Sequence, residues 1–500
     1  MKLKDRRGLE VSSRNQESVD RFEEAMDLTV SYFMDPLAAI NGALEQEPDF
    51  ALGHCLRAAL GVMSTERGAL SMVRESVEAV EALGNGATER ERAHAAAARR
   101  WMEGDLAGGM RAYGAIIIDH PRDLLALQVS HVGDFFLGQS TMLRDRVAQV
   151  LPHWSATVPG YGYVLGMHAF GLEETGLYDR AEDAGRKALD ANRRDPWAVH
   201  AVAHVMEMQG RIRDGIDFLS TRAPDWSVNN GLAYHNWWHL ALHHLELAEH
   251  DRALEIFDTR IRPAETSVAL EMLDASALLW RLTLRGVDVG SRWKSLAACW
   301  QPLAEDRFYA FNDAHAVMAF VGAEEWARVD NMIASLERAA QESGTNGMMS
   351  REVGLPLARA IAAFGRQDYA ATIDLLTPVR PRAHLFGGSH AQRDLLHVTL
   401  LEAALGRSKH AGQGACRRAD RAQTHQPVQL AGHGPRAQGA GPRRRSPSGD
   451  RQCGHESRGA ARSALESATR AGGGLSYDES SAWRNMAERP AASTGIMADA

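Results

Sequence analysis

The sequence predicts an all-α fold: a right-handed superhelical solenoid of antiparallel helix pairs, followed by a disordered C-terminal tail. Apolar residues recur at three- and four-residue spacing through most of residues 15–406, which is the period of amphipathic helices. Glycine and proline separate these periodic segments, and strand patterns are weak. Similar segments also recur at a nearly constant interval, which is typical of repeat proteins.

Four glycines mark the repeat interval. Gly104 and Gly138 lie 34 residues apart, and Gly176 and Gly210 are separated by the same interval. A period of about 34 residues is typical of the tetratricopeptide repeat, in which each unit contains two antiparallel helices. Glycine lets the chain leave the first helix in a left-handed conformation, so we expect each of these residues to end the first helix of a unit.

Degenerate copies are expected on both sides of these units. The copy after Gly210 has Glu249 at the glycine position. Later copies turn at Gly322, Gly365 and Gly406, and their spacing is longer. These copies extend the predicted solenoid toward both ends of the chain.

Composition divides the chain into three parts. Residues 1–20 contain basic residues without an apolar stretch, and we expect a flexible N-terminus. Residues 21–407 carry the helical pattern and form the solenoid. Residues 408–500 nearly lack large aliphatic side chains, so they bury too little apolar surface to offset chain entropy. Because the pattern stops abruptly where another helix is due, this tail is either disordered or the product of a reading-frame error.

Composition also excludes several classes of protein. The formal net charge is −8, and the tail is basic, so the solenoid is more acidic than the whole chain and suits nucleic-acid binding poorly. We expect no membrane span and no signal peptide, because no apolar run is long enough. The four cysteines form no C-x-x-C pair, which favours a reducing, cytoplasmic location. No phosphate-binding loop, nucleophile elbow or H-E-x-x-H motif is present.

Several phrases of the sequence resemble the tetratricopeptide repeat protein 38 family. The most distinctive are "NNGLAYHNWWHLALHHLEL" and "LDASALLWRLTLRGVDVGSRW". The resemblance covers about residues 20–406 and implies an all-helical array, without implying a reaction. The chain departs from the family pattern after Arg407.

The pattern H-x-x-x-H-x-x-E occurs twice, in "HAVAHVME" and "HLALHHLE". Positions 0, 4 and 7 of a helix share one narrow face, so each copy groups its three ionisable side chains. In proteins with this repeat, the equivalent face of the first helix lines the concave groove. The resemblance therefore places six side chains on the inner wall of adjacent units: His200, His204, Glu207, His239, His243 and Glu246.

Four uses of this face are open from the sequence. Histidine and carboxylate at one-turn spacing can bind zinc, manganese or iron. Histidine can also act as a general acid or base. With Trp197 and Trp238 as flat anchors, the face can bind a peptide or a small ligand. The remaining alternative is packing, in which buried His–Glu pairs satisfy one another.

Other candidates for the same groove are His168, Glu173 and His235, which lie near the doubled motif in sequence. Asp274 lies in an apolar helix two turns before Arg281 and is either part of the groove or exposed. Asp313, followed by His315, is either an N-terminal helix cap or part of a site.

The sequence therefore predicts an interaction protein that binds a peptide or small ligand in a concave groove lined by His, Glu and Trp. No cofactor is required by this function, and neither nucleic acid nor a membrane is an expected partner. The alternative is a metal-binding protein or metal-dependent enzyme that uses the doubled motif. Of the two, the non-enzymatic function is favoured, because the chain lacks a catalytic motif.

Overall fold

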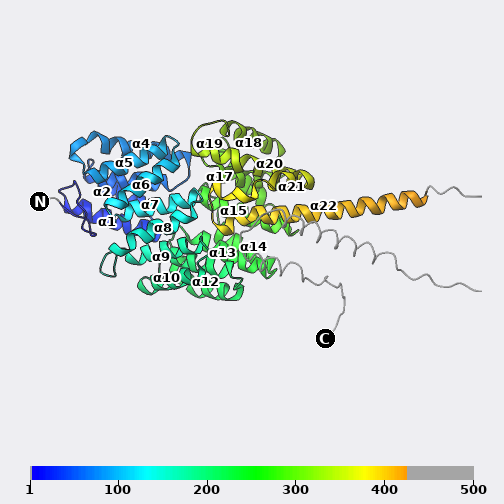
Figure 1. The fold of residues 1–500 in the computed structure, drawn as a ribbon, viewed down its shortest axis with the longest axis horizontal. Helices are drawn as coiled ribbons and strands as arrows, with labels where there is room; N and C mark the ends of the chain where they lie inside the picture. The colour runs from blue at the N-terminus through cyan, green and yellow to red at the C-terminus, as the bar shows by residue number, and fades with distance from the viewer. Residues whose placement is uncertain (1–2, 425–500) are drawn as a thin grey trace, which may run out of the picture.

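The structure, a computed structural model, describes residues 3–424, with side chains described up to residue 408. These residues form 22 α-helices joined by short turns, with isolated β-bridges in place of strands (Figure 1). Most consecutive helices pack against each other, and they form antiparallel pairs. The predicted all-α array of antiparallel helix pairs is confirmed.

The first half of the solenoid comprises α1 (Gln16–Ser31), α2 (Pro36–Gln46), α3 (Ala51–Val62), α4 (Leu70–Ala82), α5 (Glu89–Met102), α6 (Leu106–Asp119), α7 (Leu124–Phe136), α8 (Ser140–Val150), α9 (Tyr161–Glu173), α10 (Tyr178–Ala191) and α11 (Pro196–Met208). The second half comprises α12 (Ile212–Trp226), α13 (Ala233–Glu246), α14 (His250–Ile256), α15 (Ala269–Leu284), α16 (Arg292–Trp300), α17 (Ala310–Gly322), α18 (Trp326–Ala339), α19 (Thr345–Met349), α20 (Leu355–Gly365), α21 (Tyr369–Leu376) and α22 (His390–Thr424).

The turn positions of the four central units are as predicted. Gly104, Gly138, Gly176 and Gly210 all have positive φ, between +63° and +88°. Each follows the end of a first helix, where a left-handed residue lets the chain reverse. At Gly138 a side chain is also excluded by space, because an added Cβ would collide with the backbone carbonyl of His384.

Later turns differ from the prediction. After α13 the left-handed residue is Ala248, with φ of +60°, whereas Glu249 has negative φ and begins α14 as its N-cap. In two further units the left-handed residues are Glu324 and Gln367, each two positions after the predicted glycine. Non-glycine residues tolerate this conformation at a modest cost, so the sequence marks these turns less clearly. The spacing predicted between the turn at Gly210 and the turn after α13 is therefore one residue too long.

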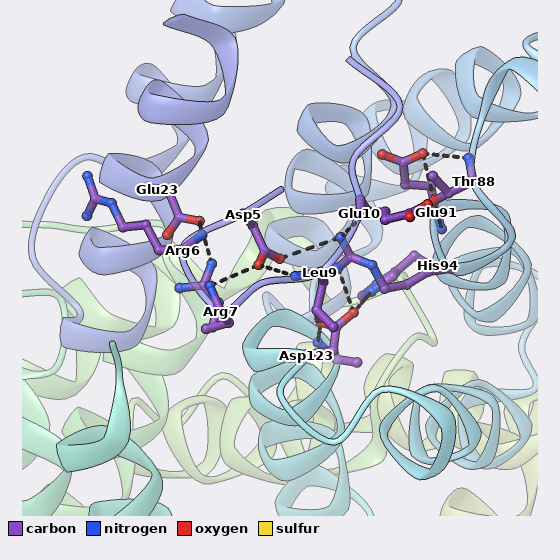
Figure 2. A network of polar contacts seen from close by, with 12 residues as sticks. Asp5, Arg6, Arg7, Leu9, Glu10, Glu23, Thr88, Glu91, His94 and Asp123 are labelled. Carbon is purple, nitrogen blue, oxygen red and sulfur yellow. Dashed lines mark hydrogen bonds and ion pairs between the residues drawn. The ribbon is translucent and has the colours of Figure 1, made fainter. Parts of the chain in front are cut away.

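The N-terminal segment, predicted to be flexible, is ordered from residue 3 (Figure 2). Arg90 of α5 lies between two buried carboxylates: its Nη1 is 2.9 Å from Asp123 Oδ2, and its Nη2 is 3.5 Å from Asp5 Oδ2. His94 Nε2 lies 2.9 Å from the same Asp123 oxygen. The prediction of a flexible N-terminus was wrong because the residues that contact Asp5 are distant in sequence. A polar terminal segment is exposed to solvent only where the folded protein offers no buried charged partner for its side chains.

The two halves of the solenoid meet across its interior. Glu66, after α3, accepts a hydrogen bond at 2.9 Å from the backbone N–H of Ala269, at the start of α15. The Asn312 side chain donates to the backbone carbonyl of Thr65 at 3.2 Å, and the Thr345 N–H donates to Gly104 O at 3.1 Å. These contacts close the superhelix on itself across its interior.

The beginning of α22 completes this closure. Its backbone N–H at His390 donates to Glu174 Oε1 at 2.7 Å, and Arg393 Nη2 lies 3.2 Å from Glu174 Oε2. The backbone of α22 continues past the predicted boundary at residue 407, to Thr424. The rest of the predicted tail, from residue 425, lies outside the described residues. Among the helices described, none has the length and apolar character to span a membrane.

Candidate functional site

Helices α11 and α13 bring four histidines together. α11 carries His200 and His204, and α13 carries His235 and His239, so each pair is one helical turn apart and shares a face. Because α11 packs against α13, the two faces meet, and one ring nitrogen from each histidine lies within 4.8 Å of the others. All four side chains are buried. We call this group the four-histidine cluster.

The rings of the cluster are in direct contact. His235 Nε2 lies 3.1 Å from His200 Nε2. The ring centroid of His204 is 4.4 Å from that of His200 and 4.4 Å from that of His239. The imidazoles therefore surround one small volume between the two helices.

Two carboxylates orient the histidines of α13. Asp274 Oδ2, on α15, lies 2.6 Å from His235 Nδ1, and Glu207 Oε2, on α11, lies 2.8 Å from His239 Nδ1. When each Nδ1–H donates to its carboxylate, the neutral ring keeps its lone pair on Nε2. Both Nε2 atoms then face the centre of the cluster as acceptors.

Burial lowers the pKa of His200, His204 and His239. Desolvation lowers the pKa of His204 to about 4 and holds the pKa of His200 and of His239 well below its ordinary value. The other histidines of the cluster reinforce the effect on His200 and His239, because like charges repel. Within the described residues, His204 has no hydrogen-bond partner at either ring nitrogen, His200 has none at Nδ1 and His239 has none at Nε2.

Three of the six predicted side chains lie outside the cluster, and one of these, Glu207, contacts His239 from the edge of the cluster. His243 is buried, but its ring packs against Gly215 of α12, where an added Cβ would collide with it. Glu246 is exposed and forms an ion pair with Arg285 at 2.7 Å. The predicted pairing of the two motifs is therefore wrong. Successive four-residue steps rotate by about 40°, so only the first two histidines of His235, His239 and His243 face α11.

A cavity of about 250 Å³ adjoins the cluster. Inner-face residues of α1, α3, α7, α11, α13, α15 and α22 line it, and most of this lining is apolar. His200, His235 and Asp274 lie in its wall. Asp274, for which the sequence left exposure open, is buried and pairs with His235, whereas Arg281 donates to the backbone carbonyl of Ala391.

The two predicted tryptophan anchors have different environments. Trp197 lines the cavity, stacks on Tyr32 with ring centroids 5.6 Å apart, and donates from Nε1 to His131 Nε2 at 3.1 Å. Trp238 is fully buried and stacks on His235 with centroids 5.4 Å apart. It lies outside the cavity lining, so it positions His235 and cannot itself serve as a flat docking surface for a ligand.

Glu173 contacts the cluster from α9. Its Oε2 lies 3.4 Å from His204 Nδ1, and burial together with the neighbouring Glu174 charge raises its pKa well above the ordinary value. Glu174 differs because His390 and Arg393 lower its pKa against the effect of burial.

The remaining predicted residues are elsewhere. His168 is half-buried, and burial with the charges of Arg180 and Arg144 lowers its pKa. His315 is buried and its Nδ1 lies 2.8 Å from the carbonyl of Phe311, one turn earlier in α17.

Asp313 is not the N-cap of its helix. α17 begins at Ala310 with Tyr309 as its cap, so Asp313 lies one turn inside the helix. The sequence suggested a cap because an acidic residue preceded an apolar run. Asp313 is buried beside a separate small pocket, with Oδ2 unpartnered in the described residues.

Sequence reasoning missed several residues of the site. Gln128, on α7, lines the cavity and donates to Tyr32 Oη at 3.2 Å, and Gln392 reaches the cavity from α22. Glu174 anchors the same segment of α22. These polar residues belong to no repeated motif, and their partners are distant in sequence, so no local pattern pointed to them.

Several solved structures of helical proteins are similar to this chain. The APC/C hetero-tetramer Cut9–Hcn1 has 12% sequence identity and a TM-score of 0.37, over 77% of this chain and 76% of that chain. The human IFIT1 dimer with m7Gppp-AAAA has 11% identity and a TM-score of 0.38, over 80% and 88%. Yeast Tom70 has 12% identity and a TM-score of 0.32, over 82% and 96%. No family model matches the chain. Likenesses at this level carry no argument about what this chain binds.

Proposed function

We propose that the chain is a helical-repeat binding protein that holds a small, mostly apolar ligand in its central cavity. The cavity carries this proposal: helices from both halves of the solenoid line about 250 Å³ of largely apolar space. Ligand sites combine such a lining with a few convergent polar groups. Because the superhelix closes on itself, a small ligand fits this interior better than the extended peptide that an open groove would admit.

The polar groups of the cavity define the expected ligand further. The His235–Asp274 pair, Gln128 and Gln392 contribute hydrogen-bonding groups to an otherwise apolar wall. A ligand with one polar end can exchange hydrogen bonds with these groups while its apolar part replaces water along the remaining wall. A highly charged ligand would lose more hydration than these groups restore.

Access to the cavity is expected beside the loop between α1 and α2. Met34 lines the cavity and is 53% exposed, so the cavity lining reaches the surface there. Gly231, also in the lining, is exposed on the facing loop before α13. Phe33 and Asn230 form a β-bridge between the two loops. A small molecule would enter beside this bridge.

Native mass spectrometry of the purified full chain, followed by organic extraction, tests for a ligand retained from expression. An apolar dye that fluoresces on burial then provides a binding assay. Val132→Phe adds bulk to the cavity wall, so it is expected to weaken dye binding at least tenfold. The control is Ile118→Phe, because Ile118 is 63% exposed and lies outside the cavity lining. Equal dye affinity in the wild type and in a folded Val132→Phe variant would contradict the proposal.

Membership of the tetratricopeptide repeat protein 38 family and a cytoplasmic location belong to the same proposal. The family resemblance is supported by the sequence phrases in α13 and α15, which supply His235 and Asp274 to the cavity. The location is supported by the spacing of the four cysteines, which form no C-x-x-C pair.

A further inference from the structure

We propose that the four-histidine cluster is a metal site, with His200, His204, His235 and His239 as the ligands of one divalent first-row transition ion, Zn²⁺ in the first instance. This inference does not rest on the proposed function, because the ion would lie among the four rings and the apolar ligand in the adjoining cavity. It replaces the set predicted from sequence, since His235 takes the place of His243. Glu207 then supports a ligand instead of binding the ion, and Glu246 has no part in the site.

The spacing of the ring nitrogens is close to that of a tetrahedral metal site. Zn–N bonds are about 2.1 Å long, so neighbouring nitrogens of a tetrahedral site lie about 3.4 Å apart. His235 Nε2 and His200 Nε2 are 3.1 Å apart, and ligand-capable nitrogens of all four histidines lie within 4.8 Å of one another. Small side-chain rotations would bring the other nitrogens to ligand distance.

Carboxyl groups around the cluster orient its histidines as they do in metal sites. Histidines that bind metals usually donate their other ring N–H to a carboxylate or a carbonyl, which fixes the tautomer and the ring orientation. Asp274 and Glu207 occupy this position for His235 and His239, and Glu173 lies 3.4 Å from Nδ1 of His204. The three carboxyl groups come from three different helices, so the arrangement is not a by-product of one helical repeat.

Buried ring nitrogens of the cluster lack hydrogen-bond partners, which favours a bound ion. A buried polar atom without a hydrogen bond costs about 1–3 kcal/mol, so folded proteins rarely retain several in one place. His204 Nε2 and His239 Nε2 are two such atoms within the cluster. Packing alone leaves both without a partner, whereas a bound ion takes up the lone pair of each.

The chemistry of the donors selects the ion. Neutral imidazole suits Zn²⁺, Cu²⁺, Ni²⁺ and Fe²⁺, whereas Mg²⁺ and Ca²⁺ require oxygen ligands. The nearby carboxylates of Asp274 and Glu207 offset the charge of a buried divalent ion.

Titration of the chelator-treated full chain with Co²⁺ and then Zn²⁺ tests the site. We expect one Co²⁺ per chain, with the strong visible bands of tetrahedral coordination, and displacement of Co²⁺ by Zn²⁺. His204→Asn and His239→Asn should each weaken Zn²⁺ binding at least tenfold. The control variants are His243→Asn, a buried histidine of the same helix outside the cluster, and His168→Asn, a half-buried histidine of α9. Both controls should bind like the wild type.

Three results would overturn the proposal: no stoichiometric binding by the folded wild type, a Co²⁺ spectrum of octahedral type, or unchanged affinity in both cluster variants. Circular dichroism identifies any variant that fails to fold. In that event Asp274→Asn, which leaves all four ligands in place, provides the second measurement. It should weaken Zn²⁺ binding about tenfold or more, since loss of such a supporting carboxylate typically costs 10–100-fold. Failure of this site would leave the dye-binding test of the cavity unaffected.

Discussion

His235 Nδ1 lies 2.6 Å from Asp274 Oδ2, and this buried contact joins α13 to α15 beside the central cavity. Burying either side chain alone in an apolar wall would cost free energy, because its polar group would have no hydrogen-bond partner. Their pairing also sets which nitrogen of His235 faces the four-histidine cluster. One hydrogen bond therefore links the cavity, the cluster and the packing of two consecutive repeats.

Removal of this acceptor should destabilise the fold. Asp274→Ala leaves His235 Nδ1 buried without a partner, which costs about 1–3 kcal/mol in the free energy of unfolding. Urea denaturation followed by tryptophan fluorescence measures the change. Asp183→Ala is the control, because Asp183 pairs with Lys187 on the exposed surface of α10, where solvent screens the interaction and the effect on stability should be small. Equal effects of the two substitutions would contradict the role given to the His235–Asp274 contact.

The N-terminal network should be among the most sensitive parts of the molecule. Asp123→Ala removes the carboxylate that Arg90 and His94 share and leaves a buried guanidinium with weaker compensation (Figure 2). Loss of one partner from a buried ion pair costs about 3–5 kcal/mol. The unfolding free energy should fall by this amount. Protection of residues 3–15 against proteolysis should fall with it, and a protected segment in the variant would argue against anchoring by this network.

The same carboxylate gives the protein an acid limit. Burial alone would raise the pKa of Asp123, but His94 and Arg90 and their hydrogen bonds lower it far below the ordinary value of about 3.9. A group with a depressed pKa contributes stability above its unfolded pKa, and this contribution is lost as the pH falls below about 4. Thermal melts from pH 7 to 3 should therefore show a steeper loss of stability in the wild type than in Asp123→Asn. Parallel curves would exclude Asp123 as a cause.

Asp313 should have the opposite pH dependence. Burial raises its pKa to about 8, with the charge of Asp306 as a further cause. The folded state therefore holds a proton that the unfolded state has released, and stability falls as the pH rises from about 4 toward 8, by at most about 1.4 kcal/mol per pH unit. Asp313→Asn removes this titration. The unfolding free energy of the variant minus that of the wild type should therefore be larger at about pH 9 than at about pH 5, as measured by chemical denaturation.

The anchor of α22 provides a further prediction. Glu174→Ala removes the acceptor for the His390 N–H and the partner of the buried Arg393, so the first turns of α22 should open more often. Hydrogen exchange of residues 389–400 should become faster, because local opening costs less free energy. Glu182→Ala, a change in a partly exposed ion-pair cluster with Arg186 and Arg211, away from α22, should leave this exchange unchanged. Slow exchange in the Glu174 variant would show that other contacts hold the helix.

The sequence by itself determined the helices, their pairing and the central turns. Helical periodicity and glycine at the turn positions are local properties, and four glycines with positive φ confirm that reading. The sequence also identified the histidine pairs His200/His204 and His239/His243, because four-residue spacing places each pair on one helical face, and it named His235 as a further candidate. These statements need no knowledge of distant neighbours.

Only the tertiary structure decided which of these histidines meet. The sequence paired the motifs through Glu249, but the turn residue is Ala248, and the face of α13 toward α11 carries His235 instead of His243. The closed interior, the buried network of Asp5 and the Glu174 anchor of α22 depend on contacts between residues far apart in sequence. Such contacts depend on the summed small rotations between successive helix pairs. A periodic pattern predicts which face of each helix is buried, but it does not determine how far each helix pair is rotated relative to the next.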